Sequence, residues 1–415
     1  MRIPSTLSQL CLLCLLATCL IATFDQGHAA ELFVADRAND RIVSFDETTG
    51  AFVRFVTTTG LDQPSGLAFG PGGFLYVSNL QSGNAPSVAK VDPVTGITTP
   101  FITDVVGPGG IAYHAASDSL FVSEFGNFDG DEVFRYDAAG TLMQTLGTGS
   151  APTGRGGLTF DSAGNLYVSE TNLFGLVGSV QKFAAPVGNP LGNFATSSTT
   201  FASGATVTLA IPAPPTGFSG LAFNDSGDLF VASLIGQALI KFSVSAGVVT
   251  HAIPFGAPIP YPSGVLIGED GNILVSSLGN NNPADPFYGN NLFPGSISRF
   301  NAFNFSTVSF LVGDINRDTV VDNADLAVWQ ATSGTPYVLN ANGDLDGDWN
   351  TDGRDFLLWQ RGHGNQGVSG SFLPTGMVRY EPLLANASVP EPASGVLALL
   401  AITWSALRRF CQTEK

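Results

Sequence analysis

Three residue types are scarce in this chain of 415 residues: cysteine (4), methionine (3) and lysine, which occurs at Lys90, Lys182, Lys241 and Lys415. The cysteines lie within the first 19 residues or at position 411, so residues 31–410 contain none. A disulfide framework, a thiol nucleophile and a Cys-ligated metal site are therefore excluded for that part of the chain. The shortage of Lys, Glu, Arg and Met, which are strong helix formers, excludes a helical bundle or a coiled coil.

Positive charge is also scarce. There are 17 Lys and Arg against 34 Asp and Glu, which gives a formal net charge of −17. No basic patch is available to neutralise phosphates, so the composition excludes a nucleic-acid-binding protein. A hydrophobic fraction of 44% excludes a disordered chain. Abundant glycine (49), proline (25) and phenylalanine (31) indicate a turn-rich β protein, which we expect to act outside the cytoplasm.

Both ends of the chain carry short apolar runs that we interpret as targeting signals. Arg2 precedes an apolar run from Leu10 to Ala22, and small residues follow at 27–30, so residues 1–30 are predicted to be a signal peptide. At the other end an apolar run over 393–407 is followed by two arginines, which predicts a short transmembrane helix with a cytoplasmic C-terminus. The sorting motif comprises Val389, Pro390, Glu391, Pro392, Arg408 and Arg409.

This three-part tail resembles the PEP-CTERM sorting signal of bacterial surface proteins. The resemblance covers residues 389–415, with residues 366–388 as a linker. It implies recognition by a membrane protease, an exosortase, and a place in the cell envelope or extracellular matrix with at least transient membrane anchoring.

The middle of the chain is built from six repeats. Each repeat has a strand core ending in valine, and these valines (Val34, Val77, Val122, Val168, Val231 and Val275) are spaced 43, 45, 46, 63 and 44 residues apart. Five cores are preceded by a strand starting at Gly66, Gly110, Gly157, Gly220 or Gly264. A third strand ends in a base (Lys90, Arg135, Lys182, Lys241 or Arg299), which we interpret as a packing and pairing element.

About 45 residues and four strands per repeat are typical of a propeller blade. The fold class predicted from the sequence is therefore all-β: a six-bladed β-propeller over residues 31–311, followed by a small α-helical module. The 63-residue interval between Val168 and Val231 contains an insertion near 184–217, which is expected to be a loop or an extra hairpin. The first repeat has no inner strand before residue 31, so the ring closes imperfectly or residues between 366 and 384 supply a strand. Residues 34–46 resemble an NHL repeat, which implies a fold more firmly than a function.

One face of the predicted propeller carries polar residues just after the strand cores. Asp36, Asn79, Glu124 and Glu170 occupy this position in the first four repeats. They are candidates for binding a cation or another polar ligand at the channel mouth, and the alternative is that they cap turns and join strands by hydrogen bonds. Sugar stacking at this face would have to use Phe or Tyr, because all four tryptophans lie beyond the propeller.

Two enzyme families with related propellers offer an alternative. A gluconolactonase-like hydrolase places its metal ligands largely before the inner strands, where this chain has only Ser and Gly, which are poor ligands for a hard cation. A streptogramin lyase requires a His and acid pair on this face. The propeller has His114 and His251, placed elsewhere and expected to be structural.

An acidic, duplicated segment follows the propeller. Residues 313–355 contain nine Asp and two Arg. Oxygen ligands stand at loop positions 1, 3, 5, 9 and 12, with the backbone carbonyl of position 7 added, and the pattern recurs 30 residues later before a second helix. The predicted metal ligands are Asp314, Asn316, Asp318, Val320, Asp322 and Asp325 in the first loop, and Asp344, Asp346, Asp348, Asn350, Asp352 and Asp355 in the second.

The duplicated unit, residues 312–365, resembles a type I dockerin. The resemblance implies two Ca²⁺ ions and a cohesin-like partner. Thr319 and Trp349 replace the glycine usual at position 6, which predicts weaker binding in the first loop. Taken together, we expect an exported bacterial surface protein whose propeller recognises a protein or polysaccharide. The alternative is a propeller enzyme, a lactonase or a glycan lyase or hydrolase, acting at the channel face on an extracellular substrate.

Overall fold

The computed structural model describes residues 30–80, 86–125, 132–147, 153–172, 178–203, 217–243, 248–253, 261–278, 295–300, 307–308, 311–316, 320–334, 343, 345, 351–367 and 374–380. Within these ranges no helix is long and apolar enough to cross a membrane. The predicted signal peptide, apart from Ala30, and the predicted sorting motif lie outside the described residues.

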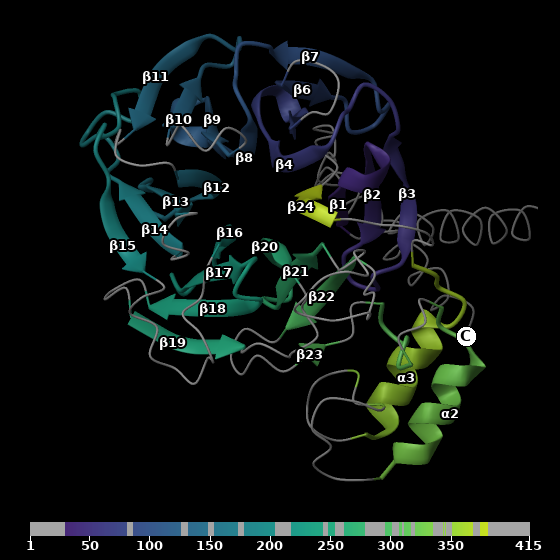
Figure 1. Ribbon diagram of the computed structural model, residues 1–415. Coiled ribbons are helices and arrows are strands. Elements are labelled where there is room, and N and C mark those ends of the chain that lie inside the picture. Colours follow the sequence, from purple (N-terminus) through teal and green to yellow (C-terminus); the bar gives the residue numbers. More distant parts are fainter. Residues whose placement is uncertain are drawn as a thin grey trace, which may run out of the picture. The chain divides into compact units, whose positions relative to one another are not determined.

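Six four-stranded antiparallel sheets follow one another around a ring and form a six-bladed β-propeller (Figure 1). Blades 2 to 6 are each built from four consecutive strands, numbered from the centre outward. Blade 2 comprises β4 (Pro64–Phe69), β5 (Leu75–Asn79), β6 (Ser87–Val91) and β7 (Thr98–Ile102); blade 3 comprises β8 (Pro108–His114), β9 (Ser119–Glu124), β10 (Glu132–Tyr136) and β11 (Leu142–Gly147). Blade 4 comprises β12 (Thr153–Phe160), β13 (Leu166–Asn172), β14 (Gly178–Phe183) and β15 (Thr199–Ser203). Blade 5 comprises β16 (Phe218–Phe223), β17 (Leu229–Ser233), β18 (Ala238–Ser243) and β19 (Val248–Ile253); blade 6 comprises β20 (Pro262–Ile267), β21 (Ile273–Ser277), β22 (Ser296–Phe300) and β23 (Thr307–Val308).

Blade 1 joins the two ends of the propeller sequence. Its three outer strands are β1 (Glu31–Asp36), β2 (Arg41–Asp46) and β3 (Phe52–Thr57), and its inner strand is β24 (Pro374–Tyr380). β24 pairs antiparallel with β1, with Phe33 opposite Val378. Of the two sequence alternatives, imperfect closure or a strand from 366–384, the second is confirmed. The segment assigned to a linker thus contains a strand, because β1 needs an inner partner for its backbone groups.

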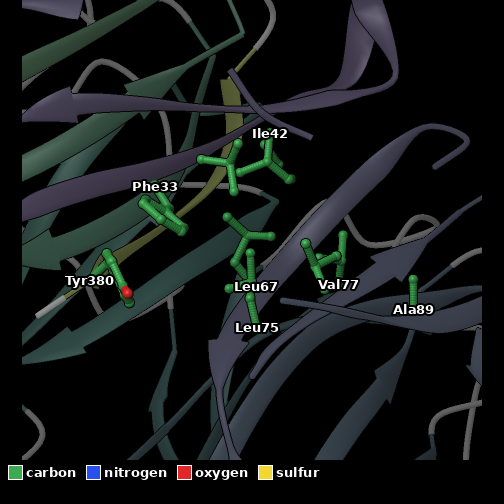
Figure 2. Close-up of a cluster of buried hydrophobic side chains, with 10 residues drawn as sticks. Phe33, Ile42, Leu67, Leu75, Val77, Ala89 and Tyr380 are labelled. Carbon is green, nitrogen blue, oxygen red and sulfur yellow. The ribbon is translucent and has the colours of Figure 1, made fainter. Parts of the chain in front are cut away.

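The core lies between neighbouring sheets. The strand cores predicted from the valine repeat are fully buried, as in Leu75, Tyr76 and Val77 of β5. Figure 2 shows one cluster between blades 1 and 2, in which Phe33 and Tyr380 have ring centroids 4.8 Å apart. Burial on both faces explains why these strands are apolar throughout rather than alternating.

Six glycines, one in each inner strand, lie where those strands come closest to one another: Gly66, Gly110, Gly157, Gly220, Gly264 and Gly376. A Cβ on Gly66 would lie 2.9 Å from Gly110 Cα, and a Cβ on Gly220 would lie 2.7 Å from Gly264 Cα. The same relation continues round the ring, and Gly376 contacts the backbone of Ser65. Backbones this close leave no room for a side chain, so the repeated glycine sets the spacing of the blades.

The insertion near 184–217 is more than a loop. It supplies β15, the outer strand of blade 4, which the sequence analysis did not identify. Before that strand it reaches back to blade 3, where Gln144 Nε2 donates to Phe194 O at 2.8 Å and Phe194 N donates to Gln144 Oε1 at 3.1 Å. Short 3₁₀ turns follow β1, β4 and β8 as η1 (Arg37–Asn39), η2 (Pro71–Gly73) and η3 (Ala115–Ser117).

Among the described residues, two helices lie between β23 and β24 in the chain. They are α2 (Asn323–Thr332) and α3 (Gly353–Gly362), and they begin where the duplicated loops predict helices. Their small core includes Leu311, Val321, Leu345 and Trp359. We call residues 311–367 the helical module. Ala51, from the turn between β2 and β3, packs against this core.

Candidate functional site

The predicted site residues fall into two groups. Asp36, Asn79, Glu124 and Glu170 end or nearly end the second strand of blades 1 to 4. Seven of the twelve predicted metal ligands are described, and they lie in the helical module. Among the described residues, no three His, Cys, Asp or Glu side chains gather in a group that would hold a metal ion.

Asp36 is held inside its own blade. Its side chain has no exposed surface, and its Oδ2 accepts hydrogen bonds from Arg41 Nε at 2.7 Å and from Asn39 Nδ2 at 2.7 Å. Arg41 stands opposite Asp36 in the pairing of β1 with β2. The carboxylate therefore closes the turn between these strands, and its negative charge is offset by the guanidinium.

Asn79 and Glu170 are engaged in the same way. Asn79 Oδ1 accepts from Asp62 N at 3.3 Å, and its Nδ2 donates to Ser87 Oγ at 3.3 Å. Glu170 Oε2 accepts from Ser179 Oγ at 3.0 Å and from Gln181 Nε2 at 2.9 Å. Ser87, Ser179 and Gln181 belong to the third strand of the same blade, and Asp62 lies in the connection between β3 of blade 1 and β4 of blade 2. Both groups therefore hold backbone and strands of the propeller together.

A fully buried arginine accompanies Glu170. Arg155 in β12 has no exposed side-chain surface, and its Nη2 lies 3.9 Å from Glu170 Oε1. Its guanidinium also stands 5.2 Å from the ring centroid of Phe183, a distance at which a cation–π attraction contributes. This pair gives blade 4 a buried cation where the equivalent position of blades 2, 5 and 6 holds Pro64, Phe218 or Pro262.

Serine hydroxyls next to the acidic positions join one blade to the next. Ser123 Oγ donates to Gly156 O at 2.6 Å and accepts from Gly110 N at 2.8 Å. Ser169 Oγ donates to Ser219 O at 2.6 Å, again across a blade boundary. Glu124, which directly follows Ser123, is itself buried, with 6% of its surface exposed. This part of the channel face is therefore a hydrogen-bonded framework between blades.

Three of the five bases that end the third strands, Lys182, Lys241 and Arg299, form ion pairs, in agreement with the pairing role predicted for this position. Lys241 Nζ lies 2.8 Å from Asp228 Oδ2, and Lys182 Nζ lies 3.8 Å from Asp161 Oδ2. Hydrogen bonding to Tyr167 is the main cause that raises the pKa of Lys182. The acids stand in the turns before the second strands. These ion pairs therefore link the second and third strands of a blade.

His114 has the structural surroundings expected for it. Its Nδ1 lies 2.7 Å from Ser117 Oγ, and its ring is 4.7 Å from that of Phe160. Burial, with a smaller contribution from the charge of Arg135, lowers the pKa of His114. The side chain of His251 is outside the described residues.

In the helical module, the carboxylates at loop position 12 hold the loops to the helices. Asp325 Oδ1 accepts from Ile315 N at 2.7 Å and Asn316 N at 3.0 Å, and its Oδ2 accepts from Asp322 N at 2.8 Å. Asp355 repeats this arrangement, with Leu345 N and Asp352 N each at 2.7 Å. Both aspartates are almost wholly buried, at 0% and 1% exposed. In each loop, one carboxylate therefore accepts hydrogen bonds from backbone N–H groups near the start and near the end of the loop.

The remaining described ligands surround these anchors. Asp322 and Asp352 are the N-caps of α2 and α3, accepting from Ala324 N and Arg354 N at 2.7 Å. Asp314 is buried, Asn316 N donates to Asp325, and Val320 forms a β-bridge with Gln366. The ligands predicted at Asp318, Asp344, Asp346, Asp348 and Asn350 lie outside the described residues.

Two tryptophans join the halves of the module reciprocally. Trp329 Nε1 donates to Asp352 O at 3.1 Å, and Trp359 Nε1 donates to Asp322 O at 3.0 Å. Each indole of one helix thus contacts the N-cap residue of the other helix. The donor set of carboxylate, amide and carbonyl oxygens in the first loop suits a hard cation such as Ca²⁺.

The sequence left open how the ring closes, with a strand from residues 366–384 as one of two alternatives, although a local signal could have decided it. β24 begins Pro374, Thr375, Gly376, Met377, and the inner strands of blades 2 and 6 begin Pro64-Ser65-Gly66-Leu67 and Pro262-Ser263-Gly264-Val265. This repeated signal of proline, a small residue, glycine and an aliphatic residue would have identified the closing strand. Thr375 Oγ1 donates to Pro64 O at 2.8 Å and joins blade 1 to blade 2.

No family model matches the chain. A PE-PGRS family protein of Mycobacterium tuberculosis is 46% identical over 57 residues, which is 14% of this chain and 12% of the relative. The chain thus spans about an eighth of the length of the curated relative it matches.

Several solved structures are similar at low identity. A protein of unknown function from Bacteroides caccae has a TM-score of 0.46 and 12% identity over 66% of this chain and 90% of its own. Virginiamycin B lyase from Staphylococcus aureus has a TM-score of 0.43 and 15% identity, covering 68% of this chain and 83% of its own. Hydrazine synthase from Kuenenia stuttgartiensis has a TM-score of 0.42 and 15% identity, covering 66% and 93%. Likeness at this level transfers no activity.

Proposed function

We propose that this protein is an exported bacterial binding or scaffold protein rather than an enzyme. Its propeller would recognise a protein or polysaccharide in the cell envelope or matrix. The observation that supports this proposal is the state of the channel-face groups: Asp36 and Asn79 are buried, Glu170 is partly buried, and all three are already hydrogen-bonded to other residues of the propeller. A general acid or base needs an oxygen that reaches the substrate, whereas these oxygens hold strands together.

We further propose that the helical module is dockerin-like and binds two Ca²⁺ ions. The anchoring of each loop on Asp325 or Asp355 supports this, because it draws loop position 2, and in the first loop also position 3, towards the helix that carries position 12. Bound Ca²⁺ would neutralise part of the acidic charge of the loops and hold their oxygens in one cluster. A cohesin-like domain is the partner that this part of the proposal implies.

The termini complete the proposal. A signal peptide would export the chain, and the PEP-CTERM-like tail would direct it to an exosortase and anchor it transiently in the membrane. Release of the body from this tail would leave the propeller and the helical module at the cell surface or in the matrix.

Calorimetry on the full chain tests the calcium proposal. We expect titration with CaCl₂ to give two binding events and to raise the melting temperature, with MgCl₂ as the comparison cation. Asp314→Asn should weaken one event. Asp225→Asn removes the same charge from an exposed turn in blade 5 and should change neither event. Absence of binding heat together with an unchanged melting temperature would refute the calcium module.

A second experiment separates binding from catalysis at the propeller. The full chain is incubated with lactones and with extracellular polysaccharides, and both retention on the immobilised glycan and product release are measured. We expect retention without product. Turnover that is abolished by Glu124→Gln would overturn the proposal in favour of an enzyme of the lactonase or glycan lyase type.

A further inference from the structure

The helical module is part of the connection that closes the propeller. In the chain it stands after β23 of blade 6 and before β24, the inner strand of blade 1. The chain must therefore pass through the module before β24 can take its place in blade 1. Ring closure and the folding of the module are connected by this order alone.

The module is fastened to one turn of the propeller, residues 47–51, which joins β2 to β3. Val312 N donates to Thr49 O at 2.7 Å, and Phe52 N, directly after the turn, donates to Gln366 O at 3.0 Å. Both ends of the module are thus held within a few residues of each other on blade 1.

The same turn also holds the closing strand and blade 6. Glu47 Oε1 accepts from Arg379 Nη2 at 2.7 Å, and Glu47 Oε2 accepts from Arg379 Nε at 2.6 Å. Arg299 of β22 donates from Nη2 to Glu47 O at 2.6 Å, and Glu269 N donates to Glu47 Oε1 at 2.7 Å. Residues 47–51 are therefore the point where β24, blade 6 and the helical module meet.

The first calcium loop is connected by hydrogen bonds to the residue that follows this turn. Val320, the predicted position-7 ligand, forms a β-bridge with Gln366, whose carbonyl accepts from Phe52. Val321 N donates to Asn365 O at 2.9 Å, and Gly362 lies against the carbonyl of Val312. An ion that orders the first loop would thus order the residues at both ends of the module.

We propose that the helical module holds the propeller ring closed, a role that we call the clasp, and that Ca²⁺ bound to its first loop stabilises the pairing of β24 with β1. The calcium part of this inference rests on the proposed function. With the module folded, seven residues separate Gln366 from Pro374. With it unfolded, residues 309–373 become one connection, and loop-length scaling makes closure on the order of ten- to thirty-fold less favourable. A ligand that binds the folded module shifts this equilibrium by mass action.

Hydrogen exchange measured by mass spectrometry on the full chain tests the clasp. Exchange of β24 and β1 is compared with exchange of β17 in blade 5, in CaCl₂ and in EGTA, while calorimetry reports calcium binding on the same sample. We expect Ca²⁺ to slow exchange of β24 and β1 several-fold and to leave β17 unchanged.

A variant in the turn formed by residues 47–51 distinguishes the effect of the module on β24 from calcium binding itself. Ala51→Asp places a charge against the module core without touching a predicted ligand, and Ala139→Asp is its matched control on an exposed turn of blade 3. We expect Ala51→Asp to bind Ca²⁺ and to lose the protection of β24, and Ala139→Asp to keep it. Calcium binding to the wild-type chain with unchanged exchange of β24 would overturn the clasp and leave the calcium proposal standing. No calcium binding at all would overturn both.

Discussion

Glu47 and Arg379, which are 332 residues apart in the chain, form a two-pronged ion pair at 2.6 and 2.7 Å. Glu47 is 7% exposed and Arg379 22% exposed at the side chain, so both are largely withdrawn from water. Arg379 also donates to Ile267 O in blade 6 at 3.0 Å. This pair therefore fixes the last strand of the propeller to its first and sixth blades.

Glu47→Gln should destabilise the propeller by about 2 kcal/mol, because hydrogen bonds to charged groups contribute about 1.5–3 kcal/mol each and partial replacement by an amide recovers some of this. The measurement is urea unfolding followed by far-UV circular dichroism. Glu269→Gln is the control, since its side chain is exposed and only its backbone N–H contacts Glu47. Equal stability of the two variants would show that the pair does not hold the ring.

Gly220→Ala should cost about 2–3 kcal/mol or prevent folding, since overpacking strains a close-packed core. The new methyl would lie 2.6 Å from Val265 N and 2.7 Å from Gly264 Cα, and backbone cannot move aside as a flexible side chain does. Gly353→Ala, at the first residue of α3 with nothing within 4 Å, should be neutral or stabilising by up to about 1 kcal/mol. Thermal melting of both variants checks the contrast, and a well-folded Gly220→Ala variant with wild-type stability would refute the glycine ring.

Trp359→Phe should destabilise the helical module more than Trp329→Phe. Each change removes one indole hydrogen bond, worth about 1 kcal/mol, but Trp359 is 8% exposed and belongs to the module core, while Trp329 is less buried. Exchange of α2 and α3 amides, measured with and without calcium, would report the difference. The reverse order would contradict the assignment of Trp359 to the core.

Stability should fall as the pH drops below about 6.5, in part because of His114. Burial lowers the pKa of His114 below the ordinary histidine value of about 6.5, so between the folded and unfolded pKa values the unfolded chain binds a proton that the folded chain does not. The loss from one such group is at most about 1.4 kcal/mol per pH unit.

His114→Asn should reduce that slope, because Asn keeps a polar atom near Ser117 and does not titrate. Melting temperatures from pH 7.5 to 5.5 provide the test, with His363→Asn at the exposed end of α3 as the control. An unchanged slope in His114→Asn would assign the pH dependence to other groups.

Much of the fold follows from local patterns. The apolar cores around Val34 and its five counterparts became the second strands, because burial against neighbouring sheets requires runs of apolar residues. The helices after Asp322 and Asp352 were predicted as the segments that follow the two duplicated loops, and this duplication is a local signal.

The candidate site was also predicted only in part from the sequence. The sequence identified Asp36, Asn79 and Glu170 by their place in the repeat, but it left open whether their oxygens face a ligand or a neighbouring strand. The structure engages them with Arg41, Ser87 and Gln181, and this depends on strand register. The calcium proposal still rests mainly on sequence spacing, to which the anchoring by Asp325 and Asp355 adds support.

The sequence by itself determined the number of blades, the order of their strands and the position of the two helices, because each depends on residues close together in the chain. Only the tertiary structure decided that β24 closes the ring, that 199–203 complete blade 4, and that Glu47 joins β24 to blades 1 and 6. Those features depend on which distant groups meet, and they form because unpaired strand edges and buried charges are costly until a partner satisfies them.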